Sequence, residues 1–298
     1  MGQVSTGASP AIELRHIWKV FGPGDSARTI DLSKGGSSRA EILQQTQQTV
    51  AVRDVSFSVA QGETFVVMGL SGSGKSTLIR CLSRLIEPTQ GEISLGGDDL
   101  LAMDEDQLRQ LRRGRISMVF QHFGLFPHRK VIDNIAYGLE VQKVDKSTRL
   151  ARATEVLKTV GLDGWADHYP QQLSGGMQQR ASICRALIHE PKMLLLDEPF
   201  GALDAFTREE LWCILRDLWT EQKFNVILVT HDLRESVFLA DTVYVMSKSP
   251  GRFVVKKEID LPRPRDLEVT YTPEFTHIVH ELRGHIGAMR KTSAVTTP

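Results

Sequence analysis

Hydrophobic and polar residues alternate along residues 50–59, which is typical of a strand with one buried face. Short, continuous apolar runs follow further along the chain and suit buried parallel strands. They occupy residues 64–68, 116–120, 193–196 and 226–229. Helical spacing marks the segments between them, as in the stripes Leu78, Leu82, Leu85, Ile86 and Leu211, Ile214, Leu215, Leu218. This alternation predicts an α/β fold with a mainly parallel sheet.

Other segments interrupt that alternation. Residues 23–48 are rich in Gly, Ser and Gln and are expected to be an insertion, with one short surface helix over residues 38–48. Residues 122–173 have no clear strand pattern and are predicted to be a helical insertion. Residues 242–246 and 253–259 are predicted to form a hairpin. A final helix is expected to begin at Pro273, with Thr272 as its N-cap.

Charge and composition narrow the possible functions. Lys plus Arg and Asp plus Glu both total 36, and the pI is about 7.1, so no overall field attracts nucleic acid. The three cysteines are far apart, which favours a reduced compartment over a disulfide framework or a metal site. Apolar runs are shorter than the roughly 20 residues of a spanning helix, and the first residues do not resemble a signal peptide. We therefore expect a soluble protein whose membrane role, if any, depends on partners.

The sequence GLSGSGKS at residues 69–76 matches the phosphate-binding pattern G-x-x-x-x-G-K-[ST]. A predicted strand precedes it and a predicted helix follows, so main-chain N–H groups and the helix dipole both favour an anion. Lys75 is expected to reach the β and γ phosphates, and the hydroxyl of Ser76 to bind Mg²⁺. The expected nucleotide contacts also include Gly69, Ser71, Gly72, Ser73, Gly74 and Thr77. Alone, the motif leaves kinases, GTPases and many ATPases open.

The segment LSGGMQQR at residues 173–180 resembles the signature sequence of ABC ATPases. Ser174, Gly175 and Gly176 would open a helix and form a second anion cradle, to which Gln178 also belongs. In that family the two cradles face each other across a head-to-tail dimer, so each ATP lies between the phosphate loop of one copy and the signature of the other. The resemblance therefore implies a homodimer.

Further motifs of the same family stand in the expected order. Asp197 and Glu198 follow an apolar strand and look like the Walker B aspartate, which assists Mg²⁺, and the catalytic glutamate, which acts as general base. Gln121 resembles the Q-loop glutamine, a ligand for Mg²⁺ or the attacking water. His231 resembles the switch histidine that contacts the γ phosphate, and Asp204 the D-loop residue at the dimer seam.

An aromatic side chain near the N-terminus stacks on adenine in this family, and Phe21 fits that position. Trp18 is an alternative, because the insertion after Gly22 separates both residues from the phosphate loop. The structure has to decide between the two rings.

The resemblance covers roughly residues 13–261 and implies a P-loop NTPase (RecA-like) ABC cassette with an antiparallel β subdomain and an inserted helical subdomain. The expected division is residues 1–121 for the core with the phosphate loop, 122–173 for the helical subdomain, 174–262 for the rest of the core, and 263–298 for a C-terminal extension. The implied reaction is hydrolysis of ATP to ADP and phosphate, with Mg²⁺. The short spacing between Gln121 and Ser174 leaves no room for the coiled-coil arms of DNA-repair relatives, so nucleic acid is not an expected partner.

The same resemblance implies an importer subunit at the cytoplasmic face of the inner membrane. Its partners would be integral membrane permease subunits and, indirectly, an extracytoplasmic solute-binding protein. His122, Phe123, Leu125, Phe126 and Pro127 would line a groove for a permease helix, or else pack the core against the helical subdomain. The N-terminal half is similar to glycine betaine and proline importers, whereas the C-terminal third, with SPGR and LPRPRD, is similar to the nitrate, sulfonate and taurine group. The expected solute is of the betaine, proline or choline type, with the second group as the alternative.

Overall fold

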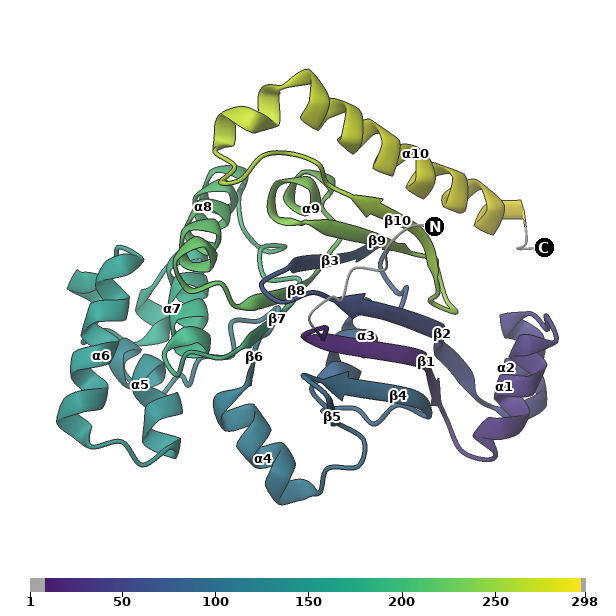
Figure 1. Ribbon diagram of the computed structural model, residues 1–298, viewed down its shortest axis with the longest axis horizontal. Helices are drawn as coiled ribbons and strands as arrows, with labels where there is room; N and C mark the ends of the chain where they lie inside the picture. Colours follow the sequence, from purple (N-terminus) through teal and green to yellow (C-terminus); the bar gives the residue numbers. More distant parts are fainter. Residues whose placement is uncertain (1–8, 296–298) are drawn as a thin grey trace, which may run out of the picture.

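The computed structural model describes residues 9–295 and contains two sheets flanked by helices (Figure 1). The larger sheet has the strand order β10-β9-β3-β8-β7-β6. Its strands from β9 to β6 are parallel, and β10 pairs antiparallel with β9. The bounds are β3 Thr64–Gly69, β6 Ile116–Val119, β7 Met193–Asp197, β8 Asn225–Thr230, β9 Thr242–Met246 and β10 Phe253–Glu258.

The central strands of this sheet are those predicted from continuous apolar runs. Every residue of β3, β7 and β8 is buried, because helices or the second sheet cover both faces. The hairpin of β9 and β10 is also confirmed, and β10 alternates between half-buried and exposed positions as an edge strand should.

The smaller sheet is antiparallel, in the order β2-β1-β4-β5. Residues from its inner face and from β3 share one hydrophobic cluster, in which the rings of Phe57 and Phe65 stack at 4.5 Å. The alternation predicted for residues 50–59 therefore becomes the strand that packs this sheet against the core. The bounds are β1 Ile12–Phe21, β2 Thr49–Val59, β4 Gln90–Leu95 and β5 Asp98–Asp99.

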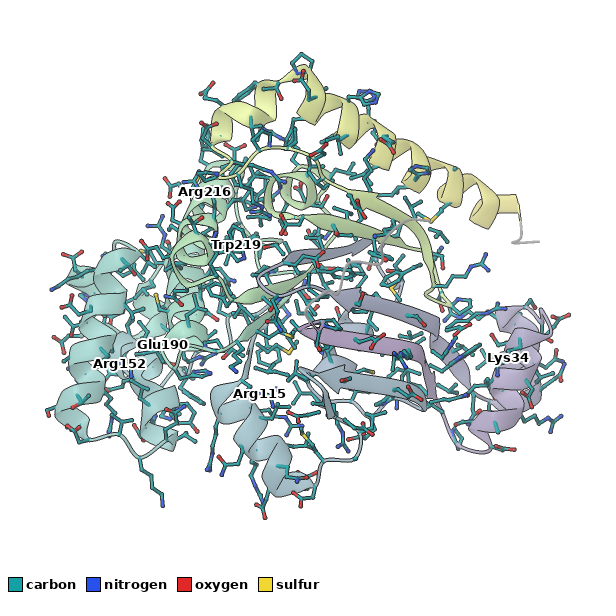
Figure 2. The ribbon with its side chains drawn as sticks, viewed as in Figure 1. Lys34, Arg115, Arg152, Glu190, Arg216 and Trp219 are labelled. Atoms are coloured by element: carbon teal, nitrogen blue, oxygen red, sulfur yellow. The ribbon has the colours of Figure 1, made fainter. Side chains whose placement is uncertain are left out.

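Helices cover the larger sheet and form a lobe beside it, on the left of Figure 1. The lobe contains α5, α6 and α7, which enclose a separate hydrophobic cluster. At its edge, Arg152 of α6 donates a hydrogen bond of 2.5 Å to Glu190; both residues are labelled in Figure 2. The helical bounds are α3 Lys75–Leu82, α4 Glu105–Gly114, α5 Val131–Val141, α6 Lys146–Thr159, α7 Gly175–Leu187, α8 Ala205–Gln222 and α9 Leu233–Leu239.

Two details of the predicted helices need correction. The stripe expected to reach Leu85 and Ile86 stops earlier, since α3 ends at Leu82 and Leu85 is 49% exposed. Residues 23–48 form two helices rather than one: α1 Ser26–Lys34 and α2 Arg39–Thr46. Both helices pack on the end of β1, where Ile30 and Ile42 bury the indole of Trp18.

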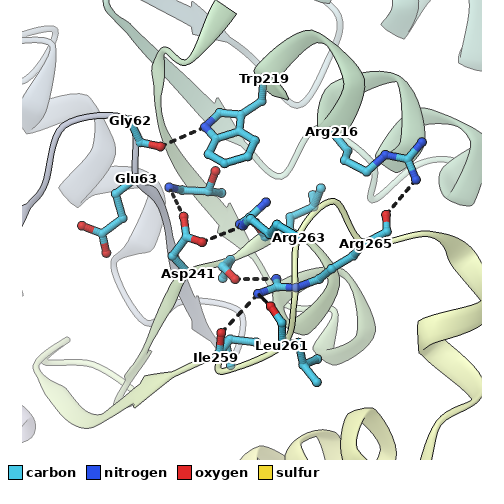
Figure 3. A network of polar contacts seen from close by, with 12 residues as sticks. Gly62, Glu63, Arg216, Trp219, Asp241, Ile259, Leu261, Arg263 and Arg265 are labelled. Atoms are coloured by element: carbon cyan, nitrogen blue, oxygen red, sulfur yellow. Dashed lines mark hydrogen bonds and ion pairs between the residues drawn. The ribbon is translucent and has the colours of Figure 1, made fainter. Parts of the chain in front are cut away.

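The C-terminal segment is bound to the core by the two arginines of LPRPRD (Figure 3). Arg263 donates to Asp241 at 2.6 Å, and its guanidinium lies 4.3 Å from the ring centre of Trp219. Arg265 is buried and donates to five main-chain carbonyls, those of Val237, Phe238, Ala240, Ile259 and Leu261. These contacts close off the C-terminal end of α9.

The last helix, α10 Pro273–Val295, begins where the sequence predicts it. The hydroxyl of Thr272 accepts a hydrogen bond from the N–H of Phe275, as an N-cap does. Phe275 and Leu282 are buried in the main core cluster, so α10 lies along the molecule, at the top of Figure 1. Among the described residues, none of the helices is both long and apolar enough to cross a membrane.

Candidate functional site

Four of the parallel strands bring the predicted catalytic residues to one edge of the large sheet. Register pairs Met68 of β3 with Thr230 of β8, and Val229 of β8 with Asp197 of β7. The phosphate loop, His231 and Glu198 follow the ends of these strands and therefore lie side by side. Gln121 follows two residues after the end of β6, the neighbour of β7, at the same edge. This edge, at the carboxyl ends of the strands, is where open α/β sheets bind ligands.

The glycines of the phosphate loop are required by its backbone. Gly72 and Gly74 have φ values of 75° and 91°, which favour glycine. A Cβ at Gly74 would lie 2.5 Å from the carbonyl oxygen of Ala51 on β2, so the loop fits closely against the smaller sheet. The helix α3 then begins at Lys75 without a side-chain cap, which leaves its first N–H groups available to an anion.

Lys75 is held inside this loop. Its ammonium group donates to the carbonyls of Gly69 at 3.0 Å and Leu70 at 3.1 Å, and lies 3.5 Å from Oε1 of Glu198. The side chain is only 3% exposed, and burial lowers the pKa of Lys75, an effect that Glu198 partly opposes. A buried cation with carbonyl partners is ready to exchange these weak contacts for phosphate oxygens.

Ser76 and Asp197 form the second part of the site. The Ser76 hydroxyl donates a hydrogen bond of 2.6 Å to Oδ1 of Asp197, and Arg80 lies 3.2 Å from Oδ2. A hydroxyl and a carboxylate oxygen at this separation are hard donors of the kind that Mg²⁺ prefers. Ser76 and Asp197 therefore fit the metal that they are expected to hold, whereas Gln121, the third expected ligand, is exposed.

Glu198 stands at the mouth of the loop in an unusual conformation. Its φ is 48°, which is rare for a residue with a side chain and is a form of strain found at functional sites. The N–H of Glu198 donates to the carbonyl of Val229 at 2.9 Å, which fixes the main chain. Oε2 of Glu198 then lies 3.3 Å from Nδ1 of His231. The carboxylate thus has one cation below it and an imidazole beside it.

The signature residues lie on another helix. Ser174 caps α7 and accepts a hydrogen bond of 3.3 Å from the N–H of Met177, while Gln178 donates to the carbonyl of Leu173. Gly176 approaches the α8 residue Thr207, since a Cβ at Gly176 would lie 2.2 Å from its methyl group. Asp204 caps α8, and hydrogen bonds from Thr207 lower the pKa of its carboxyl. The signature and the D-loop therefore form one continuous surface.

A cavity of about 610 Å³ opens beside the phosphate loop. Residues from four parts of the chain line it: Gly69, Leu70, Ser71, Glu198, His231, Leu233, Arg283, Ile286 and Gly287. Its lining includes the phosphate loop, the glutamate and the histidine, but none of the signature residues. Within one chain, the cavity therefore contains only one of the two expected anion cradles, the phosphate loop.

The two aromatic rings that could stack on adenine differ in their exposure. Trp18 is 2% exposed in the cluster beneath α1 and α2, so its ring has no free face for a base. Phe21 is 42% exposed at the end of β1, with the ammonium group of Lys19 4.9 Å from its ring centre. Burial thus favours Phe21 as the stacking residue, a role that stays a prediction.

Several residues near the site were not anticipated from the sequence. Gly251 lies against the phosphate loop, since a Cβ there would be 2.0 Å from the carbonyl oxygen of Ser73. Arg208 donates to Asp232 at 2.7 Å and to the carbonyl of Leu203, which joins the D-loop to the segment after His231. Arg283 enters the site from α10. No pattern in the sequence pointed to these contacts.

Comparison with known proteins agrees with this geometry. The family model described as ABC transporter matches residues 52–201, from β2 through the phosphate loop to the glutamate. The chain belongs to the ABC transporter family. The resemblance and the fold class inferred from the sequence are both confirmed. The match also includes the signature segment, which decides between this family and other phosphate-loop proteins.

Curated ABC relatives are similar over most of the chain. The glycine betaine transport ATP-binding protein OpuAA of Bacillus subtilis is 48% identical over 79% of this chain, but the match spans only 56% of OpuAA. The trimethylamine N-oxide transport system ATP-binding protein TmoW of Ruegeria pomeroyi is 40% identical over 96% of this chain and 83% of its own length. The nitrate import ATP-binding protein NrtD of Synechocystis is 39% identical over 76% of this chain and 84% of its own.

A solved structure also shares the fold. A dimeric, post-hydrolysis ATP-binding cassette, MJ0796 bound to ADP and Pi, is 29% identical, with a TM-score of 0.70. The match covers 84% of this chain and all of MJ0796. That cassette is a dimer with nucleotide bound. The present chain spans little more than half the length of its relative OpuAA.

Proposed function

We propose that this chain binds and hydrolyses ATP and that hydrolysis powers the import of a small methylated amine through a separate permease. The observation that carries the ATPase proposal is the position of Glu198. Its strained backbone holds the carboxylate between Lys75 and His231, at the wall of the cavity that the phosphate loop also lines.

Nucleotide binding follows from the loop. The N–H groups at the start of α3 and the ammonium of Lys75 would hold the phosphates, and Ser71, Gly72, Ser73 and Gly74 would surround them. Thr77, in the first turn of α3, would contact the α phosphate, and Phe21 would stack on adenine. Ser76, Asp197 and Gln121 would hold Mg²⁺, which when bound would neutralise charge on the phosphate oxygens.

Hydrolysis requires a water in line with the terminal phosphate. Glu198 would accept its proton as general base, because its carboxylate lines the cavity and lies beside the ammonium group of Lys75. His231 would orient the same water or the γ phosphate through the imidazole edge that does not face Glu198. Gln121 lies at the junction with the helical lobe. Its contact with the γ phosphate would be coupled to a rotation of residues 122–173.

A second copy of the chain would complete the site. The signature residues Ser174, Gly175, Gly176 and Gln178 do not line the cavity of their own chain, so an anion cradle remains for a neighbour. Asp204 lies on the same surface, through Thr207 and Gly176. The dimeric state of MJ0796 supports this homodimer. In this proposal each ATP lies between the loop of one copy and the signature of the other.

The permease would bind at the boundary between residues 1–121 and 122–173. Phe123, Leu125 and Phe126 are half-buried there, while His122 and Pro127 are exposed. The main chain of this segment is bound to α7, since Ser182 donates to the carbonyl of Phe123 and Arg185 to that of Gly124. Its outer surface stays available to a permease helix, which would hold the chain peripherally at the cytoplasmic face of the inner membrane.

The relatives support the proposed solute class. TmoW aligns across 96% of the chain, and OpuAA is 48% identical over 79% of it. The substrates in their names, trimethylamine N-oxide and glycine betaine, share a methylated, formally cationic nitrogen. NrtD supports nitrate as the alternative. An extracytoplasmic binding protein would select the solute, so the chain itself need not contact it.

The variant Glu198→Gln tests the ATPase proposal. It should bind ATP, lose about 10²–10⁴-fold in turnover, and accumulate as an ATP-bound dimer in light scattering. The exposed Glu221→Gln is the control. Full turnover in Glu198→Gln would reject the assigned base.

The solute is tested with the reconstituted permease and binding protein loaded with betaine, trimethylamine N-oxide, taurine or nitrate. Stimulation by taurine or nitrate alone would contradict the methylated-amine assignment.

A further inference from the structure

The C-terminal helix α10 forms one wall of the catalytic cavity. Arg283, Ile286 and Gly287 line it opposite Gly69, Ser71, Glu198 and His231. These three residues are spaced i, i+3 and i+4, so they share one face of the helix. No family motif identified in the sequence includes them, and the family match ends at residue 201.

The position of this wall is fixed by buried contacts. Leu282, next to Arg283, is fully buried in the main core cluster, and Phe275 is buried two turns earlier. Ile278, Val279 and Ile286 pack against the same cluster. Lys257 of β10 adds an ion pair of 2.7 Å with Glu281. A helix anchored on both sides of Arg283 holds that residue at the cavity with little freedom of its backbone.

Arg283 is the cation that this wall presents. Its side chain is exposed, and within residues 9–289 it has neither a hydrogen bond nor an ion pair. The other charged groups of the cavity are already paired, since Glu198 contacts both Lys75 and His231. A guanidinium has five donors and matches phosphate geometry in a bidentate manner. Arg283 therefore lacks an anionic partner in a cavity built beside a phosphate loop.

The position of Arg283 along the nucleotide follows from its neighbours. The cavity is lined by the first residues of the loop and by Glu198 and His231, whereas the adenine-end residue Phe21 does not line it. A ligand group in this cavity is therefore the terminal phosphate rather than the base or the α phosphate.

We propose that Arg283 binds the terminal phosphate of the nucleotide, as an additional residue of the site contributed by the C-terminal helix. This inference rests on the proposed ATP binding. It makes Arg283 selective for the triphosphate over the diphosphate, because ADP has no group in this part of the cavity. Arg283 would also hold the phosphate in place while Glu198 activates the water.

Nucleotide affinity of the isolated chain tests the proposal. The probes are ADP and the non-hydrolysable β,γ-imido analogue of ATP, at protein concentrations where light scattering gives a monomer. Arg283→Ala should weaken the analogue about tenfold, as expected for loss of a charge-assisted contact, and leave ADP affinity within about twofold. Arg283→Lys should recover part of the loss, because it keeps the charge without the bidentate geometry.

The matched control is His285→Ala, an exposed position on the same helix that does not line the cavity. It should leave both affinities unchanged. Arg283→Gln keeps most of the side-chain length and serves if the alanine variant lowers the melting temperature.

Three results would overturn the inference. Equal losses for both nucleotides would indicate a structural effect, and no loss for either would remove Arg283 from the site. Unchanged monomer affinities together with loss of the ATP-dependent dimer would assign Arg283 to contact with the second copy. If the wild-type chain bound neither nucleotide, the proposed function itself would fail, which the wild-type titration distinguishes from the other results.

Discussion

The Ser76 hydroxyl lies 2.6 Å from Oδ1 of Asp197, although 121 positions separate the two residues in the chain. The hydrogen bond joins the first turn of α3 to the end of β7. It brings a hydroxyl and a carboxylate together beside the loop that would hold the phosphates. Packing of α3 against the sheet therefore creates the set of oxygen donors, which neither sequence motif contains alone.

Ser76→Ala removes one of these donors. We expect the Mg²⁺ concentration for half-maximal ATPase activity to rise by about tenfold or more, because the ion would lose its proposed ligand Ser76 and Asp197 would lose its hydrogen bond. Steady-state ATPase assays at varied Mg²⁺ measure this. Ser76→Thr keeps the hydroxyl and is the matched control. Equal Mg²⁺ requirements for the alanine and threonine variants would contradict the assignment.

Gly176 and Thr207 provide a test of packing behind the signature. A Cβ at residue 176 would lie 2.2 Å from the Thr207 methyl group, so Gly176→Ala should destabilise the fold by about 1–3 kcal/mol through overpacking. At Gly175 the nearest atoms are 3.5 Å away, an ordinary contact, so Gly175→Ala should change stability much less. Urea unfolding of both variants measures the difference.

The double variant Gly176→Ala/Thr207→Ser makes that test specific. Serine removes the clashing methyl group and keeps the main-chain N–H that Asp204 caps. Most of the lost stability should return. A double variant no more stable than Gly176→Ala would mean that the alanine acts elsewhere.

Glu235 gives the fold a dependence on pH. It is buried near the start of α9, and burial, followed by the charge of Asp232, raises its pKa to about 8. Between the ordinary pKa of 4.5 and about 8, the native state binds a proton that the unfolded state has released. Stability therefore falls as pH rises through this window, by up to a few kcal/mol.

Glu235→Gln should flatten that pH dependence and stabilise the chain most above pH 8, because the amide stays neutral. Urea unfolding between pH 5 and pH 9 measures the effect. The exposed Glu274→Gln is the control and should leave the wild-type profile unchanged. Parallel profiles for Glu235→Gln and the wild type would contradict the prediction.

Much of the fold could be predicted because its strands are buried on both faces. The continuous apolar runs that became β3, β7 and β8 have few other stable environments in a folded domain. The helix α1 could not be predicted in this way, since it has few apolar residues. It is stabilised by Trp18, which belongs to β1 and precedes it in the chain.

The residues of the candidate site also fall into two groups, those that the sequence predicts and those that it does not. Lys75, Ser76, Asp197, Glu198 and His231 lie in local motifs that follow strands, and register then brings them together. Gly251 and Arg283 contact the site only through tertiary packing of the hairpin and of α10. No periodicity or spacing along the chain encodes those approaches, so sequence reasoning alone could not find them.

Burial of Arg265 has a consequence for any shortened form of this protein. A polypeptide ending at residue 262 would deprive five carbonyl oxygens of their donor and strip the cover from α9. The apolar surface vacated by Phe275 and Leu282 would then face water and favour aggregation. The segment from residue 263 through α10 thus behaves as an integral part of the folded core, and mutational mapping of the protein should retain it.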